Sequence, residues 1–357
     1  MKNKIITFLF IAYIFIFALF SFILPDKEIS SSERRKLNKF PKFEFDSEYI
    51  EDVDKYLLDH FPLRDAFRSL KANFNYKILN KLDNNEIYLK DNYIFKSNYP
   101  TNKYSIDSFI TKTNKLKDLL TKDNNVYMMI VPDKNYYLED KNFLNIDYDY
   151  IYSIMEKEEN IDIRTLLSLE DYYETDTHWK QEKLDKVVEK LVTSMGHTYK
   201  KVDYKYNTYD KFYGVYYGES AINRKPEKLT YLTNETTNNA KVKYLENDKL
   251  TSVYNTNKLN GLDAYEVYLD GASSFIEIYN SNNNSGKELV IFRDSFGSSI
   301  TPLLIDYYSK ITVIDNRYIT SKYFLEHISF TNQDILFLYS TLIVNNSVSL
   351  KGWLIIR

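Results

Sequence analysis

The chain has 357 residues and a formal net charge of −3, with 44% apolar and 27% charged residues. This balance is typical of a globular protein rather than a disordered one, and the small net charge, spread along the chain, does not indicate a nucleic-acid surface. The absence of cysteine excludes disulfides, thiolate metal sites and a cysteine nucleophile.

An uncharged apolar run, IITFLFIAYIFIFALFSFIL, occupies residues 5–24. A helix needs about 20 apolar residues to cross the hydrocarbon core of a bilayer, so the run is long enough. A cleaved signal peptide is the alternative, but such a peptide has a shorter apolar region and ends at a small-residue cleavage site. Here the candidate small residues, Ala18 and Ser21, are separated by bulky side chains. We therefore expect an uncleaved signal anchor with one span in the cell membrane and the C-terminal domain outside the cytoplasm.

A polar stretch at residues 25–46 follows and is interpreted as a stem. Residues 47–82 are predicted to be helical, with a break at Pro62. The apolar positions that recur at helical spacing are Tyr56, Phe67, Leu70, Phe74 and Ile78. The stretch EIYLKDNYIF (86–95) alternates around a turn signal and predicts a hairpin.

Four short apolar runs further along the chain predict buried strands, at 126–131, 288–292, 311–315 and 334–340. Helical patterns lie between them, one beginning at Trp179 and one capped by Ser298 or Ser299, whereas 200–260 is interpreted as loops and edge strands. This alternation predicts an α/β fold with a parallel sheet and flanking helices, and functional groups at the carboxyl ends of the strands. The predicted parts are a signal anchor at 1–24, a stem and helical region at 25–85, and an α/β domain at 86–357.

Ser295, in LVIFRDSFGSS, lies where a strand gives way to a turn and then a helix. A hydroxyl at this place is exposed at the end of the sheet, and the amides that begin the next helix can stabilise an oxyanion. Gly297 would let the backbone pass close to a bound carbonyl. A serine is a weak nucleophile without a base, and a histidine oriented by a carboxylate is suited to that task.

The stretch YYETDTHWK (172–180) contains such a pair. In an extended backbone, residues i and i+2 project to the same side, so Asp176 can reach Nδ1 of His178 and leave Nε2 facing outward. Trp179 would form a wall of the site and dock the loop onto the following helix. We interpret Asp176, His178 and Ser295 as the candidate catalytic residues.

Other roles stay open when each residue is taken alone. Asp176 or Thr177 could cap the helix that begins near Trp179, His178 could be a structural histidine, and Ser295 a turn serine. Asp294 could be a cap or a salt-bridge partner, and the remaining histidines, His60, His197 and His327, are treated as structural. No metal site is expected, because one Asp-x-His pair provides only two ligands.

Several stretches together resemble the DHHW family of Gram-positive bacteria: DYYETDTHW, ELVIFRDSFGSSITPLL, YYSKITVIDNRY and DILFLYS. Members of this family are relatives of the alginate O-acetylation proteins and have an SGNH-hydrolase-like domain. DHFPLRD, NEIYLKDNYIF, DKFYGVYYGES and GLDAYEVYLDG extend the resemblance over most of the chain after the apolar run. The resemblance implies a circularly permuted, SGNH-hydrolase-like α/β fold.

The resemblance also implies roles for individual residues. Asp176 and His178 would be the acid and base of a triad, and Ser295 would be its nucleophile. Two positions depart from the family motif: Thr177 replaces its middle histidine, and Arg293 stands where a lysine is common. The residues assigned to auxiliary contacts with the substrate or the oxyanion are Arg317, Tyr339, Trp179 and Gly297.

The implied function is a membrane-anchored, extracytoplasmic O-acetyltransferase that moves an acetyl group through a serine ester onto a cell-envelope polysaccharide. A polytopic membrane acyltransferase would deliver the acetyl group. The chain has no phosphate-cradling glycine loop, so we expect no acetyl-CoA site and no cofactor. A carbohydrate esterase with the same triad and a non-catalytic glycan-binding scaffold are the alternatives. Because the chain ends soon after the last predicted strand, we expect no appended carbohydrate-binding module.

Overall fold

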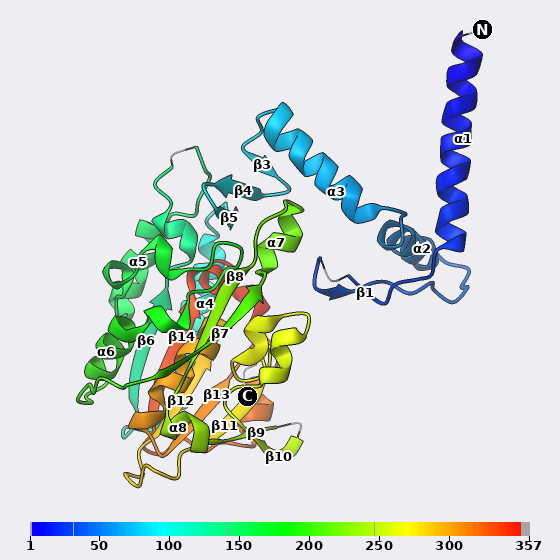
Figure 1. The fold of residues 1–357 in the computed structure, drawn as a ribbon. Helices are drawn as coiled ribbons and strands as arrows, with labels where there is room; N and C mark the ends of the chain where they lie inside the picture. The colour runs from blue at the N-terminus through cyan, green and yellow to red at the C-terminus, as the bar shows by residue number, and fades with distance from the viewer. Residues whose placement is uncertain (1, 31, 141, 246, 351–357) are drawn as a thin grey trace. The chain divides into compact units, whose positions relative to one another are not determined.

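The computed structural model describes residues 2–30, 32–140, 142–245 and 247–350 (Figure 1). Its chain divides into two compact units. The first unit comprises Met1–Ile87 with Val215–Lys225, and the second comprises Tyr88–Gly214 with Pro226–Arg357. A segment from the middle of the chain therefore joins the N-terminal unit.

The first unit is mainly helical. Its elements are α1 (Lys2–Ile23), β1 (Ile29–Ser30), β2 (Arg35–Lys36), α2 (Ser47–Asp59), α3 (Arg64–Asn73), a π-helical segment (Phe74–Ile78), β3 (Asp83–Asn84) and α7 (Val215–Ser220). The predicted helical region is confirmed, and the break falls around Pro62, between the end of α2 and the start of α3. α1 is long and apolar enough to cross a membrane, and none of the residues in its apolar window is buried.

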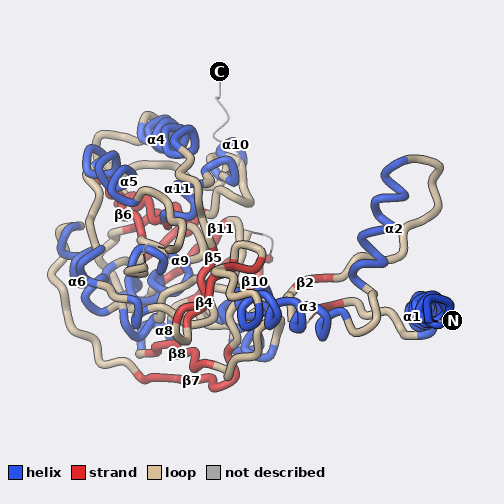
Figure 2. The backbone as a smooth tube through the Cα atoms, turned by 90° about the horizontal axis from the view of Figure 1, so that it is seen from above, coloured by secondary structure: helices blue, strands red, loops and turns tan. Residues whose placement is uncertain are grey.

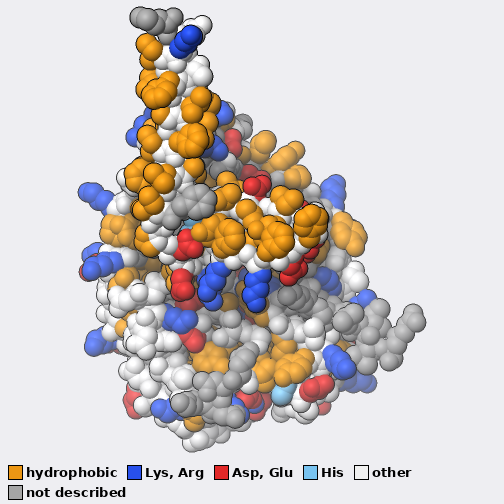
Figure 3. Space-filling view, turned by 90° about the vertical axis from the view of Figure 1, so that its right-hand side faces the viewer, with side chains coloured by type: hydrophobic (Ala, Val, Ile, Leu, Met, Phe, Trp, Pro, Cys, Tyr) orange, Lys and Arg blue, Asp and Glu red, His pale blue; other side chains and the backbone are white. Residues whose placement is uncertain are grey.

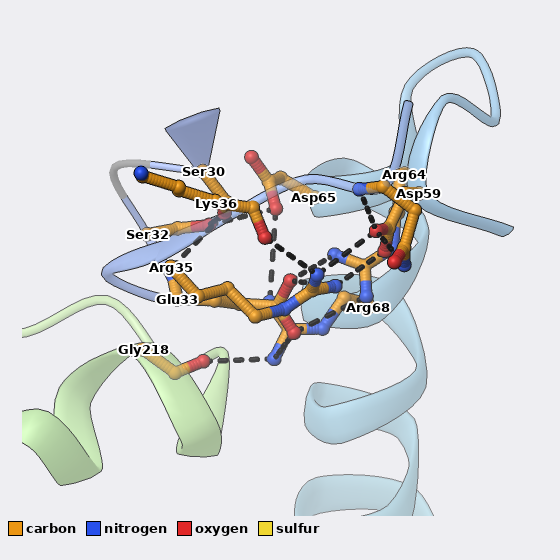
Figure 4. A network of polar contacts seen from close by, with 11 residues as sticks. Ser30, Ser32, Glu33, Arg35, Lys36, Asp59, Arg64, Asp65, Arg68 and Gly218 are labelled. Atoms are coloured by element: carbon orange, nitrogen blue, oxygen red, sulfur yellow. Dashed lines mark hydrogen bonds and ion pairs between the residues drawn. The ribbon is translucent and has the colours of Figure 1, made fainter. Parts of the chain in front are cut away.

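Charged side chains join the polar stem to the helices of the first unit (Figure 4). Arg64 donates to Glu33 at 2.6 and 3.1 Å, and Arg35 donates both to Glu33 at 3.1 Å and to Asp59, at the end of α2. The hydrogen bonds from Arg35, followed by those from Asn38, hold the pKa of the Asp59 carboxyl well below its ordinary value. These ion pairs hold the stem against the end of α2 and the start of α3.

The second unit is built on a seven-stranded sheet with strand order β10-β9-β11-β13-β12-β14-β6. Figure 1 shows its strands side by side, and Figure 2 shows helices around them. The strands are β6 (Asn125–Val131), β9 (Lys241–Tyr244), β10 (Asn247–Thr251), β11 (Phe275–Tyr279), β12 (Glu288–Arg293), β13 (Lys310–Ile314) and β14 (Asp334–Ser340). A hairpin of β4 (Ile87–Lys90) and β5 (Tyr93–Lys96) and an antiparallel pair of β7 (Lys205–Phe212) and β8 (Glu227–Thr233) lie outside this sheet.

The sheet is buried on both faces, because alternate side chains of its strands enter two different hydrophobic clusters. In β6, Met129 and Val131 belong to one cluster and Met128 and Ile130 to the other. α6 (Asp185–Ser194) contributes to the first cluster, whereas α4 (Lys103–Lys117), α5 (Tyr148–Met155), α10 (Ser321–Phe324) and α11 (Thr341–Asn345) contribute to the second. The remaining helices of this unit are α8 (Glu235–Asn239) and α9 (Phe296–Ile300).

The four predicted strands are confirmed, and β13, β12, β14 and β6 run parallel to one another in that order. The sheet as a whole is mixed, however, because β11 pairs antiparallel with β13, and β9 with β11. The physical reason lies in the connection from β11 to β12, which lies on the other side of β13. Residues 280–287 make this connection without a helix, and so short a link cannot return the chain to the opposite end of the sheet, so β11 runs opposite to β12 and β13. The sequence pattern also missed β11 and placed β9 among the loops and edge strands.

The helix after β12 differs from the prediction. α9 begins at Phe296, with Ser295 at its N-cap position, so Ser298 and Ser299 lie inside the helix rather than at its cap. The helix begins earlier because the Asp294 side chain accepts the Phe296 amide at 2.9 Å and satisfies one of the first backbone donors. The helix predicted from Trp179 instead begins later than expected. After a 3-10 turn it starts as α6 at Asp185, and its apolar stripe is buried as expected.

Candidate active site

Asp176, His178 and Ser295 meet at the carboxyl end of β12, although 117 residues separate the last two in sequence. Asp176 Oδ1 lies 2.5 Å from His178 Nδ1, and His178 Nε2 lies 2.7 Å from Ser295 Oγ. Asp176 and His178 are buried, whereas Ser295 is partly exposed. The Asp176 carboxylate thus orients the imidazole through Nδ1. The other ring nitrogen, Nε2, faces the hydroxyl of Ser295, which is the partly exposed residue of the three.

The local backbone differs from the extended segment that we expected. Residues 174–178 form a series of bends, in which Asp176 Oδ1 also accepts the backbone amide of His178 at 3.0 Å. The side chains at i and i+2 therefore meet through a turn rather than along a strand. Neither Asp176 nor Thr177 caps a helix, because the 3-10 turn and α6 have Lys180 and Leu184 at their N-cap positions.

Trp179 directly follows His178 in sequence and is fully buried. Its indole N–H donates to Ser299 Oγ at 2.8 Å and to the carbonyl oxygen of Phe296 at 3.2 Å. This placement docks the Asp-Thr-His bend onto α9, rather than onto the helix that follows Trp179 in sequence. Trp179 therefore holds the bend against α9, and a contact with substrate stays a prediction.

Tyr265 covers one face of the His178 ring. The two rings are stacked, with centroids 3.8 Å apart and an interplanar angle of 8°. Burial raises the pKa of Tyr265 well above its ordinary value, so its hydroxyl remains neutral and donates to Ser299 Oγ at 2.9 Å. The imidazole is held in plane by stacking on this tyrosine and by the hydrogen bond to Asp176.

The first amides of α9 are engaged within the protein. Phe296 N–H donates to Asp294 Oδ1 at 2.9 Å, and Gly297 N–H donates to the Asp294 carbonyl oxygen at 3.1 Å. The amide of Ser295 itself, rather than those two, is thus the candidate oxyanion donor. Gly297 serves packing, since a Cβ atom there would lie 2.7 Å from Cβ of the buried Arg293.

Arg317 follows β13, and Tyr339 lies near the carboxyl end of β14. Arg317 donates to the buried Asp315 through Nε at 2.9 Å and Nη2 at 2.7 Å, and Arg293 lies 3.4 Å from the same carboxylate. The hydroxyl of Tyr339 is buried and has no hydrogen-bond partner within the described part of the chain. Arg317 is mainly a partner of Asp315, whereas the Tyr339 hydroxyl keeps its hydrogen-bonding capacity; a substrate contact for either stays a prediction.

Two charged side chains hold the bend that carries Asp176. Lys134, which follows β6, is buried and donates from Nζ to the carbonyl oxygens of Tyr173, Glu174 and Asp176 at 3.1, 3.2 and 2.7 Å. From β8, Glu227 accepts the amides of Glu174 and Thr175 at 2.6 and 2.7 Å. The lysine thus binds the carbonyl groups of the bend and the glutamate binds its amides.

Burial lowers the pKa of Lys134 to about 7, against the opposing effect of nearby carboxylates that include Asp176 and Glu227. Gly214 packs beside the same bend, and a Cβ atom there would lie 2.1 Å from the Thr175 carbonyl oxygen. Only a residue without a side chain fits at this distance, so the bend is restrained by packing as well as by charge.

We expect Lys134→Met to lower kcat about 10- to 100-fold with little change in KM. The change leaves three buried carbonyls without their donor, at about 1–3 kcal/mol for each unsatisfied group, and a small displacement of Asp176 disturbs the triad. Hydrolysis of p-nitrophenyl acetate and thermal unfolding would be measured together. Lys180→Met is the matched control, because Lys180 contacts a carbonyl oxygen of Glu170 in an exposed position. A folded Lys134→Met enzyme with unchanged kcat would contradict this role.

Chelation of metal ions is expected to leave activity unchanged. Across the residues described by the structure, no group of three His, Cys, Asp or Glu side chains is placed to hold a metal ion. The rate of p-nitrophenyl acetate hydrolysis, measured before and after dialysis against EDTA, would check this. Loss of activity on dialysis and its recovery with zinc or manganese would contradict a metal-independent triad.

The sequence patterns missed Lys134, Glu227 and Tyr265. Lys134 had a usable signal, because it lies three residues after a predicted buried strand, at the end where functional groups gather. Glu227 and Tyr265 had no signal from periodicity, since they come from a strand of a two-stranded sheet and from a short 3-10 helix. Only their contacts with the bend and with the imidazole reveal them.

Comparisons with known proteins complete the description. No family model and no curated protein matches the chain. A DHHW family protein from Eubacterium siraeum, solved by crystallography, is similar in structure with a TM-score of 0.63 and 24% identity, covering 75% of this chain and 96% of its own. The fold is that of a DHHW family protein.

Two further solved structures resemble this chain. PatB1 from Bacillus cereus, solved with a sulfonyl adduct, gives a TM-score of 0.57 at 18% identity, covering 72% of this chain and 97% of its own. The O-acetyltransferase domain of AlgJ from Pseudomonas putida gives 0.45 at 10% identity, over 72% and 92%. The similarity to the Eubacterium siraeum protein and to PatB1 confirms the expected SGNH-like α/β architecture. The sheet differs from the expectation in being mixed rather than parallel throughout.

Proposed function

We propose that this protein is a membrane-anchored, extracytoplasmic O-acetyltransferase that moves an acetyl group through an ester of Ser295 onto a cell-envelope polysaccharide. The observation that carries the proposal is the hydrogen-bonded series Asp176–His178–Ser295 at the carboxyl end of β12. The similarity of the fold to that of a DHHW family protein supports the proposal, because the resemblance of the sequence motifs to that family implies acetyl transfer to glycans.

The proposed reaction has two half-reactions. Ser295 Oγ attacks the carbonyl carbon of the donor ester, His178 Nε2 takes the hydroxyl proton, and that proton then passes to the departing alcohol of the donor. The acetyl group is now an ester of Ser295. A sugar hydroxyl attacks this ester, its proton moves to His178 Nε2, and Ser295 Oγ recovers the proton as it leaves. Asp176 stabilises the imidazolium in both halves.

The partners follow from the same resemblance. A polytopic membrane acyltransferase would present the acetyl group outside the membrane, and α1 would hold the catalytic unit beside it. The length and apolar composition of α1 support the anchor. The acetyl acceptor would be a hydroxyl of a cell-surface polysaccharide.

The experiment offers the full chain p-nitrophenyl acetate together with oligosaccharides from a Gram-positive cell wall. We expect p-nitrophenol release to be accompanied by acetylated oligosaccharide, detected by mass spectrometry, and blocked by Ser295→Ala. Release of free acetate alone, at the same rate with and without acceptor, would favour the esterase alternative. No release at all from correctly folded protein would overturn the proposal.

A further inference from the structure

The helical region of the first unit exposes an apolar face. This face consists of Leu63, Phe67, Leu70, Phe74 and Ile78, which follow one another at intervals of three or four residues along α3 and the π-helical segment. All five side chains are exposed, Leu63, Leu70 and Ile78 to about two thirds of their surface. Residues on other sides of the same segment, such as Ala72 and Asn75, are buried. A helix of a water-soluble protein normally has the opposite arrangement, with its apolar stripe toward the core.

The two arginines of α3 point elsewhere. Figure 4 shows Arg64 and Arg68 directed at Glu33 of the stem, and Arg68 also donates to the carbonyl oxygen of Gly218 at 2.8 Å. These ion pairs fix the helix by its polar side. The apolar face is consequently held outward by the fold, rather than exposed by a loose helix.

The same apolar surface is in contact with the candidate membrane helix. The ring of Phe17 in α1 stacks on Phe61 with centroids 5.5 Å apart, and lies 5.8 Å from the ring of Phe67. Phe17 belongs to the apolar window Asn3–Ser21, and it precedes the end of α1 by six residues, which is about 9 Å along a helix. In a membrane-spanning α1, Phe17 lies within the hydrocarbon of the bilayer, so its ring partners lie at or near that depth.

Figure 3 shows that hydrophobic side chains cover α1 and continue onto the part of the first unit below it. α2 and the preceding stretch also carry exposed apolar side chains, namely Phe40, Phe43, Phe45, Ile50, Leu57 and Leu58. Such an extent of exposed apolar surface indicates a lipid or protein contact. With α1 spanning the membrane, the contact of Phe61 and Phe67 with Phe17 would place this end of the apolar face in lipid rather than in water.

We propose that the apolar face of α3 and the π-helical segment lies in the outer surface of the lipid bilayer, with its side chains among the acyl chains. This inference rests on the proposed anchoring by α1 and adds a second, in-plane attachment, as amphipathic helices make at membrane interfaces. The attachment would hold the first unit against the membrane instead of leaving it on a free tether.

Single-cysteine variants test the proposal cleanly, because the chain has no cysteine of its own. Leu70→Cys places an environment-sensitive fluorophore on the apolar face, Asp65→Cys is the matched control with an exposed side chain on the same helix, and Phe15→Cys reports on α1. The full chain is reconstituted in phosphatidylcholine vesicles, and quenching by nitroxide-labelled lipid is compared with quenching by aqueous iodide. We expect lipid quenching at position 70 to exceed that at 65 several-fold, with iodide showing the reverse.

The outcomes separate this inference from the proposed function. Lipid quenching at position 15 with iodide quenching at 70 would leave the anchor intact and overturn the in-plane attachment. A label at position 70 that is shielded from both quenchers would mean that protein covers the face, and in a purified sample this protein would be a second copy of the chain. That result would also overturn the in-plane attachment. Absence of lipid quenching at position 15 would contradict the anchor itself. Full activity of a Leu70→Cys enzyme toward p-nitrophenyl acetate would show that the labelled variant is folded.

Discussion

Replacing Ser295 with alanine is expected to reduce acyl transfer from p-nitrophenyl acetate by about 10⁴-fold or more, which is a nearly complete loss. The hydroxyl lies 2.7 Å from His178 Nε2, and its removal leaves the base without a nucleophile to activate. His178→Ala should have a similar effect. The double variant should be little worse than either single one, because the two residues act as a unit.

The neighbouring serines provide the controls. Ser298 is buried, and its hydroxyl has no hydrogen-bond partner among the residues with described positions, so Ser298→Ala should keep activity within a few-fold of the parent. Ser299→Ala removes the acceptor of Trp179 and Tyr265 and should lower stability more than it lowers the chemical rate. If Ser295→Ala retained a tenth of the parent rate while Ser298→Ala abolished it, the nucleophile would have been assigned wrongly.

Asp176→Asn is expected to lower kcat by about 10³- to 10⁴-fold while the protein remains folded. An asparagine amide facing Nδ1 favours the tautomer that carries its proton on Nε2, and this nitrogen can then no longer accept the Ser295 proton. The lost negative charge also removes the stabilisation of the imidazolium. Steady-state rates and thermal unfolding, measured on the same samples, check both parts of the expectation.

A purely structural role for Asp176 predicts a different result. The carboxylate also accepts the His178 backbone amide at 3.0 Å, and an asparagine oxygen can take over that bond. In that case Asp176→Asn would be nearly silent in rate. Asp185→Asn is a suitable control, since its carboxylate accepts the Tyr199 hydroxyl in an exposed position and should affect neither rate nor fold greatly.

Much of the architecture and the three triad candidates could be predicted from the sequence. The strands before Ser295 and around it are continuous apolar runs, which periodicity identifies without tertiary information. Asp176 and His178 are two residues apart, so their contact is local. The strand that ends before Ser295 indicated which end of the sheet would carry it. These features depend on local spacing and on composition, which a sequence displays directly.

The tertiary structure decided the rest. Lys134, Glu227 and Tyr265 come from distant segments, and their contacts with the bend and the imidazole depend on how strands and loops pack. The antiparallel β11 depends on its pairing with β13, which no local pattern encodes. The same holds for the apolar face of α3: periodicity shows that a helix has an apolar side, but only the packed fold shows whether protein covers it. Here the ion pairs to Glu33 hold the polar side inward, and the apolar side stays exposed next to Phe17 of α1.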